Sequence, residues 1–156
     1  YSVRNGTGNI NIDRSSPLLH EIIGIEEEWD LQIHNETYTS IMLSLGTGDI
    51  TMNPGDAQIT ECSLSSGAGS VSLDLSQWRG TYLPGRIESG IGDITVLFPE
   101  ESDVSVSLEQ GIGNLYISGF TGDKQGYYHN ASGENAPMID MTIVQGIGDV
   151  TLTSIP

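Results

Sequence analysis

Cysteine and basic residues are scarce in this sequence, and each shortage excludes a class of function. Cys62 is the single cysteine among 156 residues, so the chain can form neither an internal disulfide nor a thiolate metal cluster. Five Lys and Arg residues face 21 Asp and Glu, which gives a formal net charge of −16. This charge repels nucleic-acid phosphates and anionic lipids. We therefore expect no nucleic-acid partner, and we interpret Cys62 as a small buried apolar residue.

Long hydrophobic runs are missing too. No stretch approaches the roughly 18 apolar residues of a membrane span, and the start at Tyr1 carries no signal-peptide pattern. We expect no direct membrane insertion of this fragment, so membrane contact would need a separate anchor. Apolar residues at helical spacing are nearly absent, which favours an all-β fold.

Glycine, in contrast, recurs in six copies of one motif. Each copy places two glycines around one residue, followed by a short polar residue and an alternating run. The copies are NGTGNINID (5–13), LGTGDITMN (45–53), SGAGSVSLDL (66–75), SGIGDITVLFP (89–99), QGIGNLYIS (110–118) and QGIGDVTLT (145–153). Their first glycines stand at positions 6, 46, 67, 90, 111 and 146, so the spacings are 40, 21, 23, 21 and 35 residues.

A repeating unit of about 21 to 23 residues accounts for these spacings. The 40-residue gap holds two units, one of them degenerate at about 15–45, and the 35-residue gap holds one unit plus a surface loop insertion at about 119–137. We therefore predict about seven units in one domain over residues 1–156. Within a unit, apolar and polar residues alternate, as in 94–98 and 104–109, with a turn at 99–103 between them.

Three architectures accept short strands at regular intervals: an antiparallel sandwich, a propeller and a coil of stacked rungs. In a coil, each strand pairs in parallel with its copy one unit later, so the same corner has to fit every rung. The near-identity of the six copies therefore favours a single-stranded parallel β-helix, or β-solenoid.

The motif glycines are interpreted as structural corners, because glycine tolerates the positive φ that sharp turns need. They are Gly6, Gly8, Gly46, Gly48, Gly67, Gly69, Gly90, Gly92, Gly111, Gly113, Gly146 and Gly148.

The residue after the second glycine has a short side chain that can bond turn amides. In sequence order these residues are Asn9, Asp49, Ser70, Asp93, Asn114 and Asp149. Asp49, Asp93 and Asp149 never occupy consecutive units of the sequence, whereas a calcium ladder needs adjacent carboxylates. We therefore predict corner capping by these aspartates, with no metal site and no cofactor; a calcium-dependent binding protein is the alternative.

Several stretches together resemble a known family. They are EWDLQIHNETYTSIMLSLGTGDITMN (28–53), SLDLSQW (72–78), ESGIGDITVLFP (88–99) and QGIGDVTL (145–152). This ordered series is similar to the toast-rack domains, which are β-helical cell-envelope modules of adhesin-like proteins and of membrane-bound envelope-stress proteins of the LiaF type. The resemblance implies a right-handed parallel β-helix at the cell surface, tethered to a membrane anchor and mostly without an assigned activity.

The resemblance supplies no catalytic residues, and we expect a non-catalytic scaffold or interaction module. The alternative from another class is a carbohydrate-active β-helical enzyme. Against it, the basic residues are scattered rather than aligned with the repeat, at Arg4, Arg14, Arg79, Arg86 and Lys124. The three histidines, His20, His34 and His129, show no metal-ligand spacing.

The insertion GFTGDKQGYYHNASGENAP (119–137) is the best candidate for a binding loop, because long loops in compact domains are often functional. Tyr127, Tyr128 and His129 could stack on a sugar ring or on a partner surface, so a protein or a cell-wall glycan is the expected partner. The alternative is that these rings cover the open side of the coil as packing. The sequence sets no oligomeric state.

Overall fold

The structure is a computed structural model that describes residues 2–4, 7–9, 30–32, 37–122, 127–130, 133 and 135–156. The chain separates into two compact units, Tyr1–Gln32 and Ile33–Pro156. In the first unit, β1 (Ser2–Arg4) pairs antiparallel with β2 (Thr7–Asn9). All other described strands belong to the second unit, and the single domain over residues 1–156 stays a prediction.

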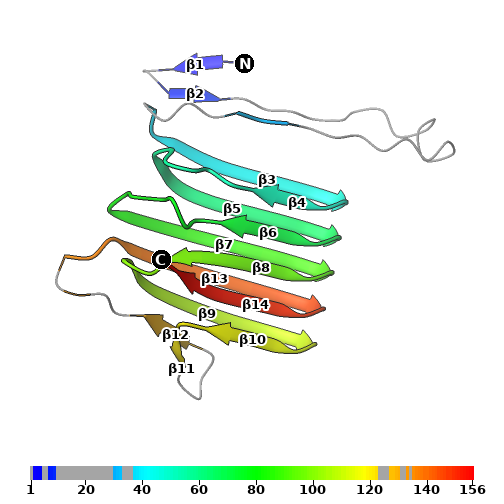
Figure 1. The fold of residues 1–156 in the computed structure, drawn as a ribbon. Helices are drawn as coiled ribbons and strands as arrows, with labels where there is room; N and C mark the ends of the chain where they lie inside the picture. The colour runs from blue at the N-terminus through cyan, green and yellow to red at the C-terminus, as the bar shows by residue number, and fades with distance from the viewer. Residues whose placement is uncertain are drawn as a thin grey trace, which may run out of the picture. The chain divides into compact units, whose positions relative to one another are not determined.

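The second unit consists of two sheets, and its described residues include no helix (Figure 1). The larger sheet contains β3 (Thr39–Thr47), β5 (Ile59–Ala68), β7 (Tyr82–Ile91), β9 (Asp103–Ile112), β11 (Thr121–Gly122), β12 (Tyr127–Asn130) and β13 (Met138–Ile147). The smaller sheet contains β4 (Ile50–Met52), β6 (Val71–Asp74), β8 (Ile94–Pro99), β10 (Leu115–Ser118) and β14 (Val150–Ile155). All pairings are parallel except those made by β12. The all-β fold with parallel strands is therefore confirmed.

A rung is formed by one strand of the larger sheet and the strand of the smaller sheet that follows it in sequence. The described residues form five such rungs, which stack in the order β3/β4, β5/β6, β7/β8, β13/β14 and β9/β10 (Figure 1). The expectation that each strand pairs with its copy one unit later is wrong at the end of the chain. There the inserted rung β13/β14 separates β7/β8 from β9/β10, because its strands pair on both sides.

Seven rungs and a right-handed coil stay predictions. The degenerate unit expected at about 15–45 lies outside the described residues, apart from 30–32 and 37–45. Thr39–Leu45 of that range belongs to β3 of the first regular rung.

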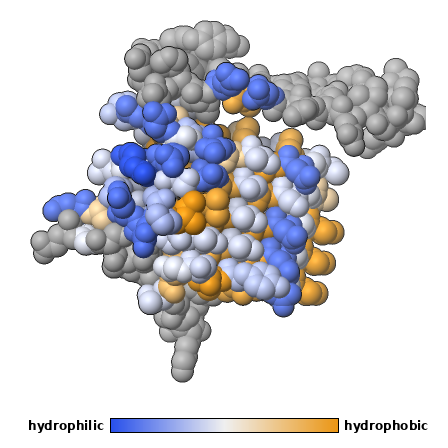
Figure 2. Space-filling model, viewed as in Figure 1, coloured by the Kyte–Doolittle hydropathy of each residue, from blue (hydrophilic) through white to orange (hydrophobic). Residues whose placement is uncertain are grey.

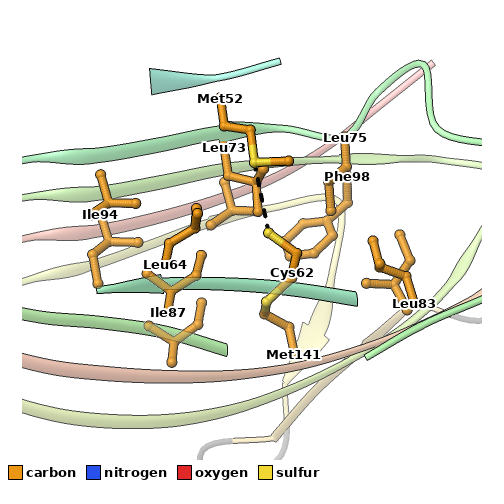
Figure 3. Close-up of a cluster of buried hydrophobic side chains, with 14 of the residues drawn as sticks. Met52, Cys62, Leu64, Leu73, Leu75, Leu83, Ile87, Ile94, Phe98 and Met141 are labelled. Atoms are coloured by element: carbon orange, nitrogen blue, oxygen red, sulfur yellow. Dashed lines mark hydrogen bonds between the residues drawn. The ribbon is translucent and has the colours of Figure 1, made fainter. Parts of the chain in front are cut away.

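The core lies between the two sheets, and it follows from the alternation in the strands. In β8, Ile94, Val96 and Phe98 are buried while Thr95 and Leu97 are only half-buried, as the period-two pattern predicts. The buried side chains of the two sheets meet in Figure 3, which shows one such cluster. Alternating burial therefore assigns one face of each strand to the core and leaves the other face at the surface.

Cys62 belongs to this core, which confirms its interpretation as a buried apolar residue. Its side chain is 1% exposed, and its Sγ lies 3.8 Å from Sδ of Met52 (Figure 3). Burial raises the pKa of the Cys62 thiol from 9.0 to about 12, because the core disfavours the thiolate. The thiol is thus kept protonated, which is the opposite of what a nucleophile needs.

The insertion after β10 differs from the expected surface excursion. Its described residues form the hairpin β11–β12, and β12 pairs antiparallel with β9, with Tyr128 opposite Val106 and Asn130 opposite Val104. Both valines are fully buried. The insertion therefore extends the larger sheet at the last rung. Among the described residues there is no helix that is long and apolar enough to span a membrane.

Candidate functional site

The repeated corner is the candidate site, because it recurs in every described rung. It consists of the two glycines of the motif, the residue between them and the residue that follows. The second glycine has a positive φ in each of these rungs: 131° at Gly48, 141° at Gly69, 137° at Gly92, 143° at Gly148 and 150° at Gly113. Side chains with a Cβ rarely adopt this conformation, so glycine lets the chain turn from one sheet into the other.

The corners are joined to one another by backbone hydrogen bonds that follow the stacking order. The N–H of Gly48 donates to Ala68 O over 2.9 Å, and the N–H of Gly69 donates to Ile91 O over 2.8 Å. Equivalent bonds connect the inserted rung to both of its neighbours. The N–H of Gly92 donates to Ile147 O over 2.9 Å, and the N–H of Gly148 donates to Ile112 O over 2.9 Å. The corner ladder is therefore continuous through the inserted rung.

In the described rungs, the first glycine of the motif has no positive φ, and its role is to let neighbouring rungs approach. A Cβ added at Gly67 would lie 2.5 Å from Gly46 O, and one added at Gly90 would lie 2.5 Å from Gly67 O. At Gly46, in the first described rung, no described atom lies within 4 Å of such a Cβ. In every described rung except the first, glycine is thus needed at this position for space.

The corner aspartates accept hydrogen bonds from the backbone of the next rung. Oδ1 of Asp49 accepts the N–H of Ser70 over 2.7 Å, and Oδ1 of Asp93 accepts the N–H of Asp149 over 2.9 Å. Oδ1 of Asp149 accepts the N–H of Asn114 over 2.8 Å and its Nδ2 over 3.2 Å. Each aspartate therefore fixes the corner beside it.

One part of the sequence argument about these aspartates is wrong. Asp93 and Asp149 were expected to be separated by a neutral residue, yet they occupy consecutive rungs, because the inserted rung stacks directly on β7/β8. Two neighbouring carboxylates repel each other, and the hydrogen bond from the Asp149 amide to Asp93 offsets part of that cost.

A second column of side chains was missed by the sequence analysis. The residue before the first glycine donates to the carbonyl of the second glycine in the neighbouring rung. Ser66 Oγ donates to Gly48 O over 3.2 Å, Gln110 Nε2 donates to Gly148 O over 3.0 Å, and Gln145 Nε2 donates to Gly92 O. The signal was present in the sequence, since each of these positions holds Ser or Gln in the copies that begin at 66, 89, 110 and 145.

The remaining predicted site residues are not brought to this corner. Tyr127, Tyr128 and His129 lie in β12, paired with β9, and their role in binding stays a prediction. Gly8 lies in β2, opposite Val3 of the antiparallel partner strand, so the first copy of the motif does not form a rung like the others. Gly6 lies outside the described residues.

Metal-ligating and basic side chains are the other candidate groups in the described part of the chain. Within them, no group of three or more His, Cys, Asp and Glu side chains could hold a metal ion. Arg86 forms an ion pair with Glu88, and Arg79 Nη1 donates to the carbonyls of Ser76 and Trp78, each over 2.9 Å. His20, His34, Arg14 and Lys124 lie outside the described residues.

Two of three comparisons with known proteins found a match, one to a family and one to a solved structure. The family model described as the N-terminal domain of toast_rack, DUF2154, matches residues 1–97. A crystal structure of a "putative cell adhesion protein" from Clostridium sporogenes has a TM-score of 0.71 and 26% sequence identity, covering 79% of this chain and 58% of that chain. The chain thus spans little more than half of the length of that protein. A comparison with curated proteins found no match.

Proposed function

This chain belongs to the toast-rack family through the match to its N-terminal domain, DUF2154, and on that premise we propose that it is a non-catalytic interaction module of the cell envelope. It would be the extracytoplasmic part of a protein held at the membrane by an anchor elsewhere. Its partner would be another protein or a cell-wall glycan.

The structural likeness to the C. sporogenes protein is the observation that carries this proposal. The two chains share the fold over 79% of this one, and that protein is described as a "putative cell adhesion protein". Since the match covers 58% of that chain, the activity of the whole neighbour is not carried over. Only the display of a binding surface outside the cell is proposed here.

The corner explains how such a module could work without catalysis. Glycine contacts, aspartate caps and the backbone ladder fix each rung to the next. The outward side chains therefore form columns, and within a column neighbouring residues are about 4.8 Å apart. On the smaller sheet, one such column consists of Thr51, Ser72, Thr95, Thr151 and Tyr116. A flat row of hydroxyl groups ending in a half-exposed tyrosine offers hydrogen bonds and a stacking surface to a sugar chain.

Protease treatment of intact cells tests the location of this module. In cells that carry the full-length protein, an antibody against residues 37–156 should lose its signal when proteinase K is added outside, while a cytoplasmic marker persists. A signal that survives in intact cells and is lost only after lysis would contradict the extracytoplasmic location.

The proposal that the module lacks catalytic activity needs its own assay. Purified protein incubated with cell-wall polysaccharide should bind it or leave it unchanged, with no release of reducing sugar. Release that depends on the added protein, and that fails after the protein is heated, would favour the carbohydrate-active enzyme instead.

A further inference from the structure

The residue between the two corner glycines forms an exposed apolar row. We call Ile91, Ile147 and Ile112 the isoleucine ridge. Their side chains are 57%, 49% and 70% exposed, and they are neighbours because Ile147 pairs in register with both of the others. Figure 2 shows hydrophobic residues along the edge at which the strands of the larger sheet end, with hydrophilic residues beside them. In the stacking order of the rungs, Ile147 lies between Ile91 and Ile112.

The fold does not require isoleucine at these positions. Thr47 and Ala68 occupy the same place in the first two rungs, and their corners have the same positive φ at the second glycine and the same backbone hydrogen bond. None of the three isoleucines belongs to the hydrophobic core or to the residues packed against it. Large aliphatic side chains that are exposed side by side, and that the fold does not need, are typical of a docking surface.

The charges beside the ridge define the kind of partner. Asp93 and Asp149 follow Ile91 and Ile147 at the corner, and Glu109 lies exposed on the terminal rung two residues before Gly111. The structure describes the side chains of two arginines. Arg86 forms an ion pair with Glu88, and Arg79 donates hydrogen bonds to backbone carbonyls. A cationic partner is therefore favoured over a second copy of this chain, because two copies would each bring a charge of −16.

We propose that the isoleucine ridge docks a cationic polypeptide segment rich in aliphatic side chains. The aliphatic side chains would cover Ile91, Ile147 and Ile112, while lysine or arginine side chains meet Asp93 and Asp149. This inference rests on the proposed role of the module in binding, and it names a site and a partner class for that role.

A set of designed peptides provides the probe. A nine-residue peptide of alternating leucine and lysine carries both required features, a serine–lysine peptide carries the charge alone, and a leucine–glutamate peptide reverses the charge. In an NMR titration at physiological salt, the leucine–lysine peptide should shift the amide signals of Gly92, Gly148 and Gly113. The other two peptides should bind at least roughly tenfold more weakly.

Matched variants locate the site. Ile91→Thr/Ile112→Thr/Ile147→Thr, which copies the residue at position 47, should weaken the leucine–lysine peptide roughly tenfold. Asp93→Asn/Asp149→Asn keeps the acceptor oxygens and removes two charges, so it should weaken binding several-fold and reduce its salt dependence. Met42→Thr/Tyr82→Thr and Glu101→Gln/Asp140→Asn make similar changes at exposed positions elsewhere, and each should stay within about twofold.

Three results would overturn the proposal. The first is equal binding by the triple isoleucine variant and the parent protein. The second is equal affinity for the serine–lysine peptide, which would mean that charge alone is recognised. The third is self-association in sedimentation velocity that the triple variant abolishes, which would make a second copy the occupant. The protease experiment on intact cells is independent of all three, so failure of the ridge and failure of the surface location are distinguishable.

Discussion

The two glycines of each corner resist substitution for different reasons at the scale of single residues. The second glycine has a positive φ and, in every described rung after the first, is also limited by space against the neighbouring rung, whereas the first glycine is limited by space alone. Gly90 and Gly46 occupy the same corner position in different rungs, and only Gly90 has a neighbouring carbonyl close to where a Cβ would lie. The pair therefore separates crowding from backbone strain.

Gly90→Ala should destabilise the protein by about 3 kcal/mol, because the new Cβ would lie 2.5 Å from Gly67 O and the rungs would have to move apart. Gly46→Ala should change the free energy of unfolding by less than about 1 kcal/mol. Urea unfolding of both variants measures the difference. Equal midpoints for the two would show that the rungs do not approach as closely as the structure indicates.

The corner aspartates are expected to act through their acceptor oxygens rather than through their charge. Asp93→Asn keeps an oxygen for the Asp149 amide and removes a repulsive neighbour, so its stability should equal or exceed that of the parent protein. Asp93→Ala leaves that amide without its acceptor and should cost about 1 kcal/mol. A destabilised asparagine variant in thermal unfolding would mean that the negative charge itself is required.

Cys62 gives a pH dependence with a defined sign. Its thiol has a pKa of about 12 in the folded protein, against 9.0 as its ordinary value, so the folded state favours the neutral thiol. The contribution is complete below about pH 9 and is lost as the pH rises towards 12, at about 1.4 kcal/mol per pH unit. Cys62→Val should lack this decline. Urea midpoints at pH 8, 9 and 10 measure it, and parallel curves for the two proteins would contradict the assigned burial.

At the scale of elements, the inserted rung is the feature with the largest consequence. Arg86, Thr142 and Ser107 lie in register on three successive strands of the larger sheet, β7, β13 and β9. If the rungs stacked in sequence order, Arg86 would instead lie beside Ser107. Cysteine pairs at these positions distinguish the two arrangements.

In a Cys62→Ala background, Arg86→Cys/Thr142→Cys should form a disulfide under mild oxidation, because adjacent strands lie about 4.8 Å apart. Arg86→Cys/Ser107→Cys should not, because two strand spacings exceed the reach of about 7 Å between Cα atoms. Mobility on non-reducing gels and mass spectrometry report both results. A disulfide in the second pair alone would indicate that the rungs stack in sequence order.

The sequence predicts each rung well and their order poorly, for a physical reason. The strand at 94–98 and the glycine corner are determined by residues close together in sequence, so a single copy of the motif is enough to predict them. The corners at Ile91, Ile112 and Ile147 share the sequence Gly-Ile-Gly, so each of these corners could stack on either of the other two. Their order depends on the whole chain, including the long connection from β10 to β13. For the same reason, the sequence did not predict that Asp93 and Asp149 lie in consecutive rungs.

The residues proposed for binding were less predictable than the corners. Tyr127, Tyr128 and His129 were singled out because a long loop breaks the repeat, and in the structure β12 pairs with β9 and continues the larger sheet beyond the last rung. The isoleucine ridge was not identified from the sequence, because isoleucine inside a strand motif is usually a core residue. Only the turn geometry shows that these three side chains leave the core.

At the scale of the whole molecule, the net charge of −16 governs how the protein responds to ions. Cations should stabilise it by screening this charge, and the effect should depend on ionic strength more than on the identity of the ion. The adjacent carboxylates of Asp93 and Asp149 make calcium the ion to test. However, each aspartate already uses Oδ1 to accept a backbone amide, and calcium needs six to eight oxygen ligands.

Calcium and magnesium at about 1 mM should therefore raise the melting temperature by amounts within about 2 °C of each other. Sodium chloride at matched ionic strength should have a comparable effect, and Asp93→Asn/Asp149→Asn should respond to calcium as the parent protein does. Differential scanning calorimetry measures the shifts, and titration calorimetry reports any stoichiometric binding. A large shift that is specific to calcium and absent from the double asparagine variant would place an ion at the corner. Because the ion would then neutralise the carboxylates beside the isoleucine ridge, the same result would also remove the charge on which docking of a cationic segment depends.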